Sequence, residues 1–183
     1  MLNSLREATE KLHRELEKEN LANKITDHSI SLEEYKLLML QNHVAYSVVE
    51  DQLFKILDIY SPSKTQLIEE DLKSLNLEPV TCGHIRFEIF NKAEAMGAAY
   101  VILGSAMGGF IIGREMKNCE SLKDLPGQQF YSEDREGVKN WNNFTKSLKN
   151  ASFTEEEVQM AQQKAIETFQ IFSIAYKTEV PVY

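Results

Sequence analysis

The sequence has few cysteines, which can cross-link a fold, and few prolines and glycines, which interrupt helices and strands. Its 183 residues include two cysteines, four prolines and eight glycines. Cys82 and Cys119 form no CxxC pair and show no cysteine and histidine spacing typical of zinc, which argues against a disulfide framework and a zinc module. The start MLNSLREATEKLHRELEKE lacks the apolar core of a signal peptide, so we expect a protein of the reducing cytoplasm.

Positive charge is also in short supply. Twenty Lys and Arg stand against 28 Asp and Glu, a formal net charge of -8, which argues against a nucleic-acid partner because binding phosphates needs a basic face. The GxSxG, P-loop, Rossmann and HExxH motifs are absent. With 43% hydrophobic and 26% charged residues the composition is that of a globular protein, and we expect one domain over residues 1–183.

One uncharged run, Ala95 to Gly113, is long enough to be considered as a membrane span, and Gly104 and Gly108 form a GxxxG pair within it. Its five glycines dilute the hydrophobicity, and no second span or basic flank accompanies it. We therefore expect no stable membrane insertion.

Strand signals are scarce, whereas apolar residues recur at spacings of three and four, which predicts an all-α fold. Capping-box pairs mark three helix starts. The expected helices start at Ser4 (with Glu7), Ser31 (with Glu34), Pro62, Ile85 (ending at Lys117), before Trp141, and at Thr154 (with Glu157).

His13 lies at the edge of the apolar stripe of the first expected helix, a suitable place for an axial metal ligand. Arg6 is seven residues earlier on nearly the same face, roughly 10 Å away along the axis. An anion held by Arg6 while a metal sits on His13 must be extended, as a haem propionate is. A packing or surface histidine is the alternative, and no second Glu-x-x-His supports a di-iron site.

The glycines of the apolar run need an explanation, because each costs about 1 kcal/mol relative to alanine inside a helix. Gly97, Gly104 and Gly108 project to one side with Val101, and Gly108 and Gly109 together form a natural kink site. Bare backbone there suits either a flat ligand or close packing of another helix. The spacing leaves both open.

Taken together, LREATEKLHRELE, SLEEYKLLMLQNHVAYSVVE and AAYVILGSAMGG resemble segments of the bacterial heme oxygenase family, and the resemblance runs from about Leu5 to Phe172. It implies a single-domain helical fold with haem between the first helix and a kinked, glycine-rich distal helix. It also implies that His13 ligates the iron.

The same resemblance implies the other site residues. Gly104, Ser105 and Gly108 would form the catalytic distal face, and Ser105 stands where the animal-type enzymes have aspartate. Haem contacts are implied for Arg6, Tyr100, Gly109 and Lys164. The sequence departs from the family pattern at Leu103, where bacterial members commonly have glutamate, and at Val101, where the animal type has arginine.

The implied activity is cleavage of haem to biliverdin, carbon monoxide and ferrous iron, with O2 and an external ferredoxin- or flavoprotein-type electron donor. Glu17, one turn after His13, is a candidate partner for its second ring nitrogen. Two alternatives stay open: a non-catalytic haem or tetrapyrrole carrier, and a thiamine-degrading or related enzyme, which needs a catalytic cysteine.

Overall fold

The structure is a computed structural model that describes residues 1–59, 63–80, 83, 85–133 and 135–179. The regular secondary structure of these residues is entirely helical, which confirms the predicted all-α fold. The α-helices are α1 (Leu2–Glu19), α2 (Asn23–Thr26), α3 (Leu32–Leu53), α4 (Lys64–Ser74), α5 (Lys92–Glu115), α6 (Glu136–Asn150) and α7 (Glu155–Tyr176), with short 3-10 helices η1 (Met116–Asn118) and η2 (Glu120–Leu122).

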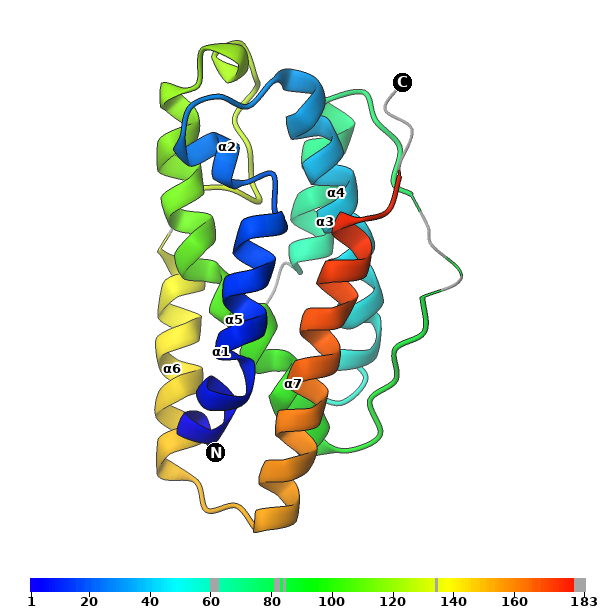
Figure 1. Ribbon diagram of the computed structural model, residues 1–183, viewed down its shortest axis with the longest axis vertical. Helices are drawn as coiled ribbons and strands as arrows, with labels where there is room; N and C mark the ends of the chain where they lie inside the picture. Colours follow the sequence, from blue (N-terminus) through cyan, green and yellow to red (C-terminus); the bar gives the residue numbers. More distant parts are fainter. Residues whose placement is uncertain (60–62, 81–82, 84, 134, 180–183) are drawn as a thin grey trace.

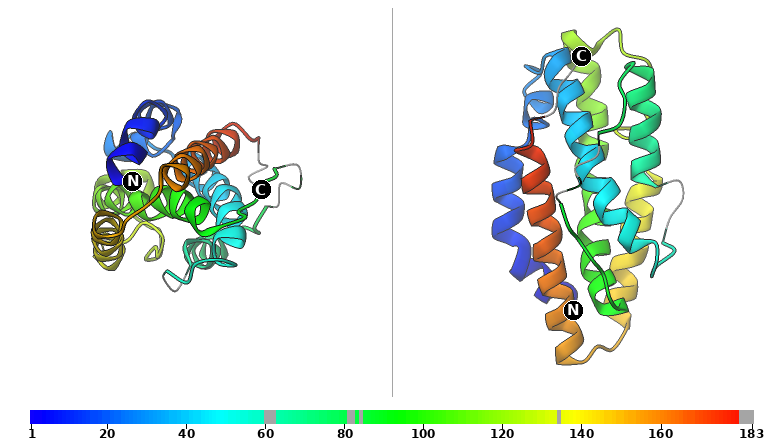
Figure 2. Two further views of the ribbon diagram at one scale, coloured as in Figure 1. Left: turned by 90° about the horizontal axis from the view of Figure 1, so that it is seen from below. Right: turned by 90° about the vertical axis from the view of Figure 1, so that its right-hand side faces the viewer.

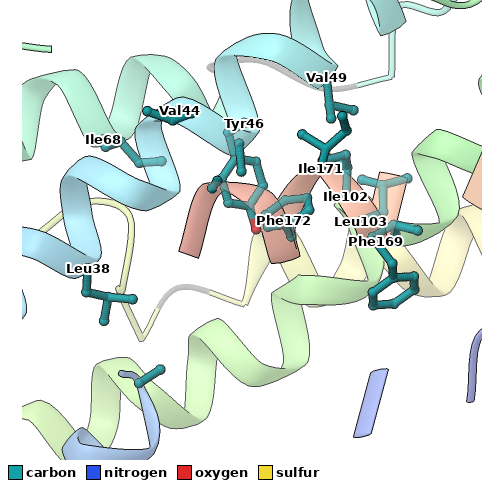
Figure 3. Close-up of a cluster of buried hydrophobic side chains, with 14 of the residues drawn as sticks. Leu38, Val44, Tyr46, Val49, Ile68, Ile102, Leu103, Phe169, Ile171 and Phe172 are labelled. Carbon is teal, nitrogen blue, oxygen red and sulfur yellow. The ribbon is translucent and has the colours of Figure 1, made fainter. Parts of the chain in front are cut away.

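Helix α5 crosses obliquely behind α1 and α7, and the end-on view shows it in the middle of the bundle (Figures 1 and 2). It packs mainly against α7 and α6, while α7 also contacts α1 and α3. The apolar core lies between these helices (Figure 3) and includes Leu38, Val49, Ile102, Ile171 and Phe172. This arrangement leaves α1 on the outside, supported mainly by α7.

Two of the three predicted capping boxes are confirmed. The Ser31 hydroxyl accepts a hydrogen bond from the backbone N–H of Glu34, whose carboxylate accepts one from the N–H of Ser31. Thr154 and Glu157 make the same exchange at the start of α7. Pro62 lies outside the described residues, but α4 begins directly after Ser63, as expected of a helix start near that point.

The predicted start at Ser4 is wrong. Helix α1 begins at Leu2, with Met1 as an N-cap that has no side-chain hydrogen bond, so Ser4 lies inside the first turn. Leu2 and Leu5 are both buried in the core. Extending the helix to include Leu2 buries a leucine side chain, worth about 1.5–3 kcal/mol, which exceeds the ~1 kcal/mol of a typical cap.

The predicted start at Ile85 is also wrong, because α5 begins only after Asn91. Residues 85–90 are not helical, and burial alternates along them, with Phe87 and Ile89 buried and Phe90 exposed. This period of two is that of an extended segment lying against the bundle. Asn91 then caps α5 by accepting the N–H of Glu94.

Among the described residues, one helix, Lys92–Asn118, is apolar and long enough to cross a membrane. It is also the helix in the middle of the bundle (Figure 2). Ala95, Ala98, Ala99 and Ile102 are fully buried by neighbouring helices. Packing in the core therefore accounts for the apolar character of the first half of this helix, whereas Met107 and Ile111 in its second half are exposed.

Candidate functional site

A cavity of about 550 Å³ opens between α1, α3, α5 and α7. Its walls are mostly apolar, and the aromatic rings of Phe130, Trp141, Phe169 and Phe172 line it. A pocket of a few hundred Å³ with a few polar groups is typical of a site for a cofactor or small molecule. The residues from sequence analysis that line it are His13, Glu17, Tyr100, Val101, Gly104, Ser105, Gly108 and Gly109.

His13 lies on the α1 wall of this cavity, and its side chain is 59% exposed. Its Nδ1 is 3.5 Å from a carboxylate oxygen of Glu17, and its ring meets Phe169 edge to face at 5.9 Å between centroids. Among the described residues Nε2 has no hydrogen-bond partner. With the proton on Nδ1, next to Glu17, the lone pair of Nε2 is free to bind a metal.

The glycines of α5 fall into two groups. A Cβ atom at Gly97 would lie 2.0 Å from the carbonyl oxygen of Ala161, and one at Gly113 would lie 2.8 Å from that of Tyr131. These two glycines allow close packing. A Cβ at Gly108 or Gly109 would meet nothing within 4 Å, and one at Gly104 would only touch the Trp141 ring at 3.6 Å.

Gly104, Gly108 and Gly109 therefore expose bare backbone to the cavity, which no packing contact requires. The packing explanation is therefore confirmed at Gly97, whereas at Gly104 and Gly108 contact with a flat ligand stays a prediction. Helix α5 is continuous from Lys92 to Glu115, so the expected kink at Gly108 and Gly109 does not interrupt it.

Ser105 is held in place by two hydrogen bonds. Its hydroxyl donates to the carbonyl oxygen of Ile102 at 2.8 Å and accepts from the hydroxyl of Tyr46, also at 2.8 Å. Burial raises the pKa of Tyr46 well above its usual range, so this phenol stays protonated and remains a donor. Sequence reasoning missed Tyr46, because an aromatic residue on a core helix looks like packing.

A second polar group on the cavity wall joins α3, α7 and the loop before α6. The Tyr176 hydroxyl donates to the side-chain oxygen of Asn42, whose amide nitrogen donates to the hydroxyl of Tyr131, both at 3.0 Å. Asp71 holds this loop by accepting the backbone N–H groups of Gln129 and Phe130, at 2.7 and 2.9 Å. The sequence contained no pattern that linked these residues.

Arg6 lies in a second hollow that adjoins the cavity. This hollow, of about 470 Å³, also contains Arg14 and shares His13, Glu17 and Tyr100 with the first. Arg6 therefore lies beyond His13 toward the N-terminus of α1, as the helix spacing predicts, and Tyr100 lines both spaces.

Lys164 is not among the residues that line either space. Its ammonium donates to the carbonyl oxygen of Glu88 at 2.8 Å and to the carboxylate of Glu167 at 2.6 Å, and lies 3.7 Å from that of Glu94. The structure does not bring it together with the other predicted haem contacts. It instead ties α7 to the segment before α5.

Another lysine, Lys64, does line the cavity and was not predicted. It is the first residue of α4, and its ammonium lies 5.8 Å from the ring centre of Tyr46 and 5.5 Å from that of Phe130. Burial lowers the pKa of Lys64 from 10.5 to about 8, and the nearby Glu50 carboxylate offsets only part of this. No sequence motif marks it.

The two departures from the family pattern lie in different surroundings. Val101 lines the cavity, whereas Leu103 is buried in the core away from it. Cys119 is buried against backbone carbonyl oxygens, outside the cavity, while Cys82 and His84 lie outside the described residues. In the described part of the chain no cluster of three or more His, Cys, Asp or Glu side chains is placed to hold a metal ion.

The chain resembles known proteins both in its sequence pattern and in its fold. The family model described as heme oxygenase matches residues 1–177. The fold is similar to that of the NO- and CO-bound heme oxygenase from Neisseria meningitidis, with a TM-score of 0.73 and 20% sequence identity over 94% of this chain and 88% of that one. At this identity the structural match shows the fold alone. No curated protein matches the chain significantly in sequence.

Proposed function

We propose that this chain, which belongs to the heme oxygenase family, holds haem between α1 and α5 and degrades it with O2 to biliverdin, carbon monoxide and ferrous iron. One observation carries the proposal. Nε2 of His13, without a hydrogen-bond partner in the described part of the chain, lies on one wall of a cavity whose α5 wall is bare backbone at Gly104, Gly108 and Gly109. A single nitrogen ligand on one side and close backbone on the other suit a flat macrocycle.

The residues present fit such a ligand. Glu17 lies 3.5 Å from Nδ1 of His13 and would accept its N–H when Nε2 binds the iron. Arg6, in the adjoining hollow, would pair with a propionate, and Tyr100 lines both the cavity and this hollow. Bound haem would supply both the iron that activates O2 and the ring that is opened.

The chain would contribute position and protons. Phe169, Phe172 and Val101 make the cavity apolar and limit water in it. The Tyr46 phenol keeps its own proton and holds the Ser105 oxygen by donating to it, so the Ser105 hydroxyl, if it turns from the Ile102 carbonyl toward the cavity, would pass on a proton that it receives from a cavity water. Electrons must come from an external donor, which we propose to be a ferredoxin- or flavoprotein-type reductase of the cytoplasm.

Haem titration followed by turnover tests the proposal. Ferric haem added to the protein should give the absorption spectrum of a histidine-ligated complex, and His13→Ala should lose it and regain it on addition of imidazole. His28→Asn is the matched control, because His28 lies outside the cavity and asparagine tolerates its φ of 56°. An unchanged spectrum in His13→Ala would refute ligation by this residue.

Adding a reductant in air to the loaded protein should then produce the biliverdin band and trapped carbon monoxide. A specific observation favours one other function, a haem or tetrapyrrole carrier: the proton of Ser105 is already donated to Ile102, and Val101 offers no polar group beside it. Stable haem binding without biliverdin would support the carrier.

A further inference from the structure

The ammonium of Lys64 has no ionic partner within the described part of the chain. It makes neither a hydrogen bond nor an ion pair there and lies over the rings of Tyr46 and Phe130. The Glu50 carboxylate attracts this charge from nearby, but its oxygens accept the backbone N–H groups of Lys64 and Thr65 and the Thr65 hydroxyl. A positive charge is thus held at the α4 side of the cavity by two aromatic faces, without a directly bonded anion among the described residues.

This arrangement is costly for a protein with nothing bound. Lys64 is half-buried, and partial removal of an ammonium from water without a directly bonded anion is unfavourable, which the two cation–π contacts offset only in part. The lowered pKa of Lys64 reflects the same cost, although at pH 7 the amine is still mainly charged. An anion bound beside the ammonium would give it a charge-assisted hydrogen bond, which the described residues do not supply.

A second donor lines the same cavity, on the other neighbour of Phe130. The Tyr131 ring packs on Phe130 at 4.6 Å between centroids, and both residues line the cavity with Lys64. The Tyr131 hydroxyl accepts a hydrogen bond from Asn42, but its own proton has no acceptor among the described residues. Burial raises the pKa of Tyr131, so the phenol stays a donor across the ordinary pH range.

We propose that this end of the cavity is a binding site for a carboxylate group, with the Lys64 ammonium as its charge partner and the Tyr131 hydroxyl as its second donor. The carboxylate can come from two sources. It is either a propionate of a bound tetrapyrrole, which rests on the proposed function, or a small free carboxylate, which does not. In the first case the propionates have two alternative partners, Lys64 in the cavity and Arg6 in the adjoining hollow.

The free source is tested on the protein without haem, with formate as the probe and chloride at equal ionic strength as the control. The Lys64 amine is followed by NMR of protein labelled at the lysine Cε carbon. Formate should raise the pKa of Lys64 by about one unit, which corresponds to about tenfold tighter binding to the charged amine. It should also raise the melting temperature, whereas chloride should do neither.

Lys64→Met removes the charge at nearly constant length, and the formate effect on melting should disappear with it. Lys139→Met, on the exposed face of α6, is the matched control and should behave as the unmodified protein. Tyr131→Phe keeps the ring and removes only the second donor, so it should weaken the formate effect without abolishing it.

The propionate source is tested by absorption titrations with haem and with its dimethyl ester, whose propionates carry no charge. If a propionate occupies the site, Lys64→Met should weaken haem binding about tenfold or more and leave binding of the dimethyl ester unchanged. If only a free carboxylate occupies it, Lys64→Met should leave both tetrapyrroles unaffected while still abolishing the formate response.

The proposal is overturned if formate leaves the pKa of Lys64 unchanged and Lys64→Met leaves haem affinity unchanged. Failure of the unmodified protein to bind haem would refute the proposed function alone, because the formate experiment needs no haem. Lys64→Gln, which keeps a polar group but no charge, provides a second variant should the methionine variant not fold.

Discussion

Replacing Gly97 and Gly108 by alanine, one at a time, separates the two reasons for glycine on α5. At Gly97 the new Cβ would lie 2.0 Å from the backbone oxygen of Ala161, so α5 and α7 must move apart. Overpacking of this kind costs about 1–3 kcal/mol and more where backbone is the obstacle. We expect Gly97→Ala to lose about 3 kcal/mol of unfolding free energy.

At Gly108 the new Cβ meets nothing within 4 Å, so only the gain in helix propensity remains. Alanine in a helix interior is more stable than glycine by about 0.5–1 kcal/mol. We therefore expect Gly108→Ala to stabilise the haem-free protein, and the two variants to differ by about 4 kcal/mol. For a chain of this size 1 kcal/mol corresponds to about 2–4 °C in melting temperature.

Urea unfolding of the haem-free proteins, followed by circular dichroism, measures both changes at constant m-value. Haem titration of Gly108→Ala and Gly108→Leu completes the experiment. If the backbone at Gly108 contacts haem, affinity should fall in the order glycine, alanine, leucine even though the alanine variant is the more stable protein. Equal stability of Gly97→Ala and Gly108→Ala would refute this division of the glycines.

Two further predictions concern buried charge. Folding lowers the pKa of Lys64 from 10.5 to about 8, so between these two pH values the unfolded chain binds more protons than the folded protein. The unfolding free energy should therefore rise with pH across this window, by up to about 3 kcal/mol. Lys64→Met should flatten this part of the pH profile of stability, and an identical profile in both proteins would contradict the prediction. Asp71→Ala leaves the backbone N–H groups of Gln129 and Phe130 without their acceptor and should lower the unfolding free energy, measured in urea, by about 2–4 kcal/mol. Asp71→Asn keeps one acceptor oxygen and should lower it less. Equal losses in the two variants would show that the charge of Asp71, and not its number of acceptor oxygens, matters.

The parts of the fold that depend on local chemistry were predictable from the sequence. The Ser31 and Thr154 capping boxes need only residues three apart, and both form as expected. Ser4 and Glu7 have the same pattern, but the helix begins at Leu2 instead, because burial of Leu2 is worth more than the cap. That burial depends on a distant part of the chain. A motif of weak local bonds is overridden wherever tertiary packing offers more.

The candidate site was predictable only on the helices whose residues carry a periodic signal. His13, Gly104 and Gly108 were found in this way and do line one cavity. Tyr46 and Lys64 come from α3 and α4, and their spacing along the chain does not reveal that they meet. Lys164 was expected at the site from the family resemblance, but Glu167 on its own helix and Glu94 on α5 hold it elsewhere.

The position of His13 on α1 has a consequence for local stability. The buried residues of this helix are Leu2, Leu5 and Thr9, all in its first half. In the half with His13, Leu12 and Leu16 are only partly buried, and its other contacts with α7 and the residue after it include the edge contact of the His13 ring with Phe169 and the ion pair of Glu19 with Lys177. Amide hydrogens there should exchange through local opening at lower free energy than those of α5. A ligand bound to His13 would add a further contact in this half of α1. Ligand binding would therefore order the helix that carries the ligating histidine.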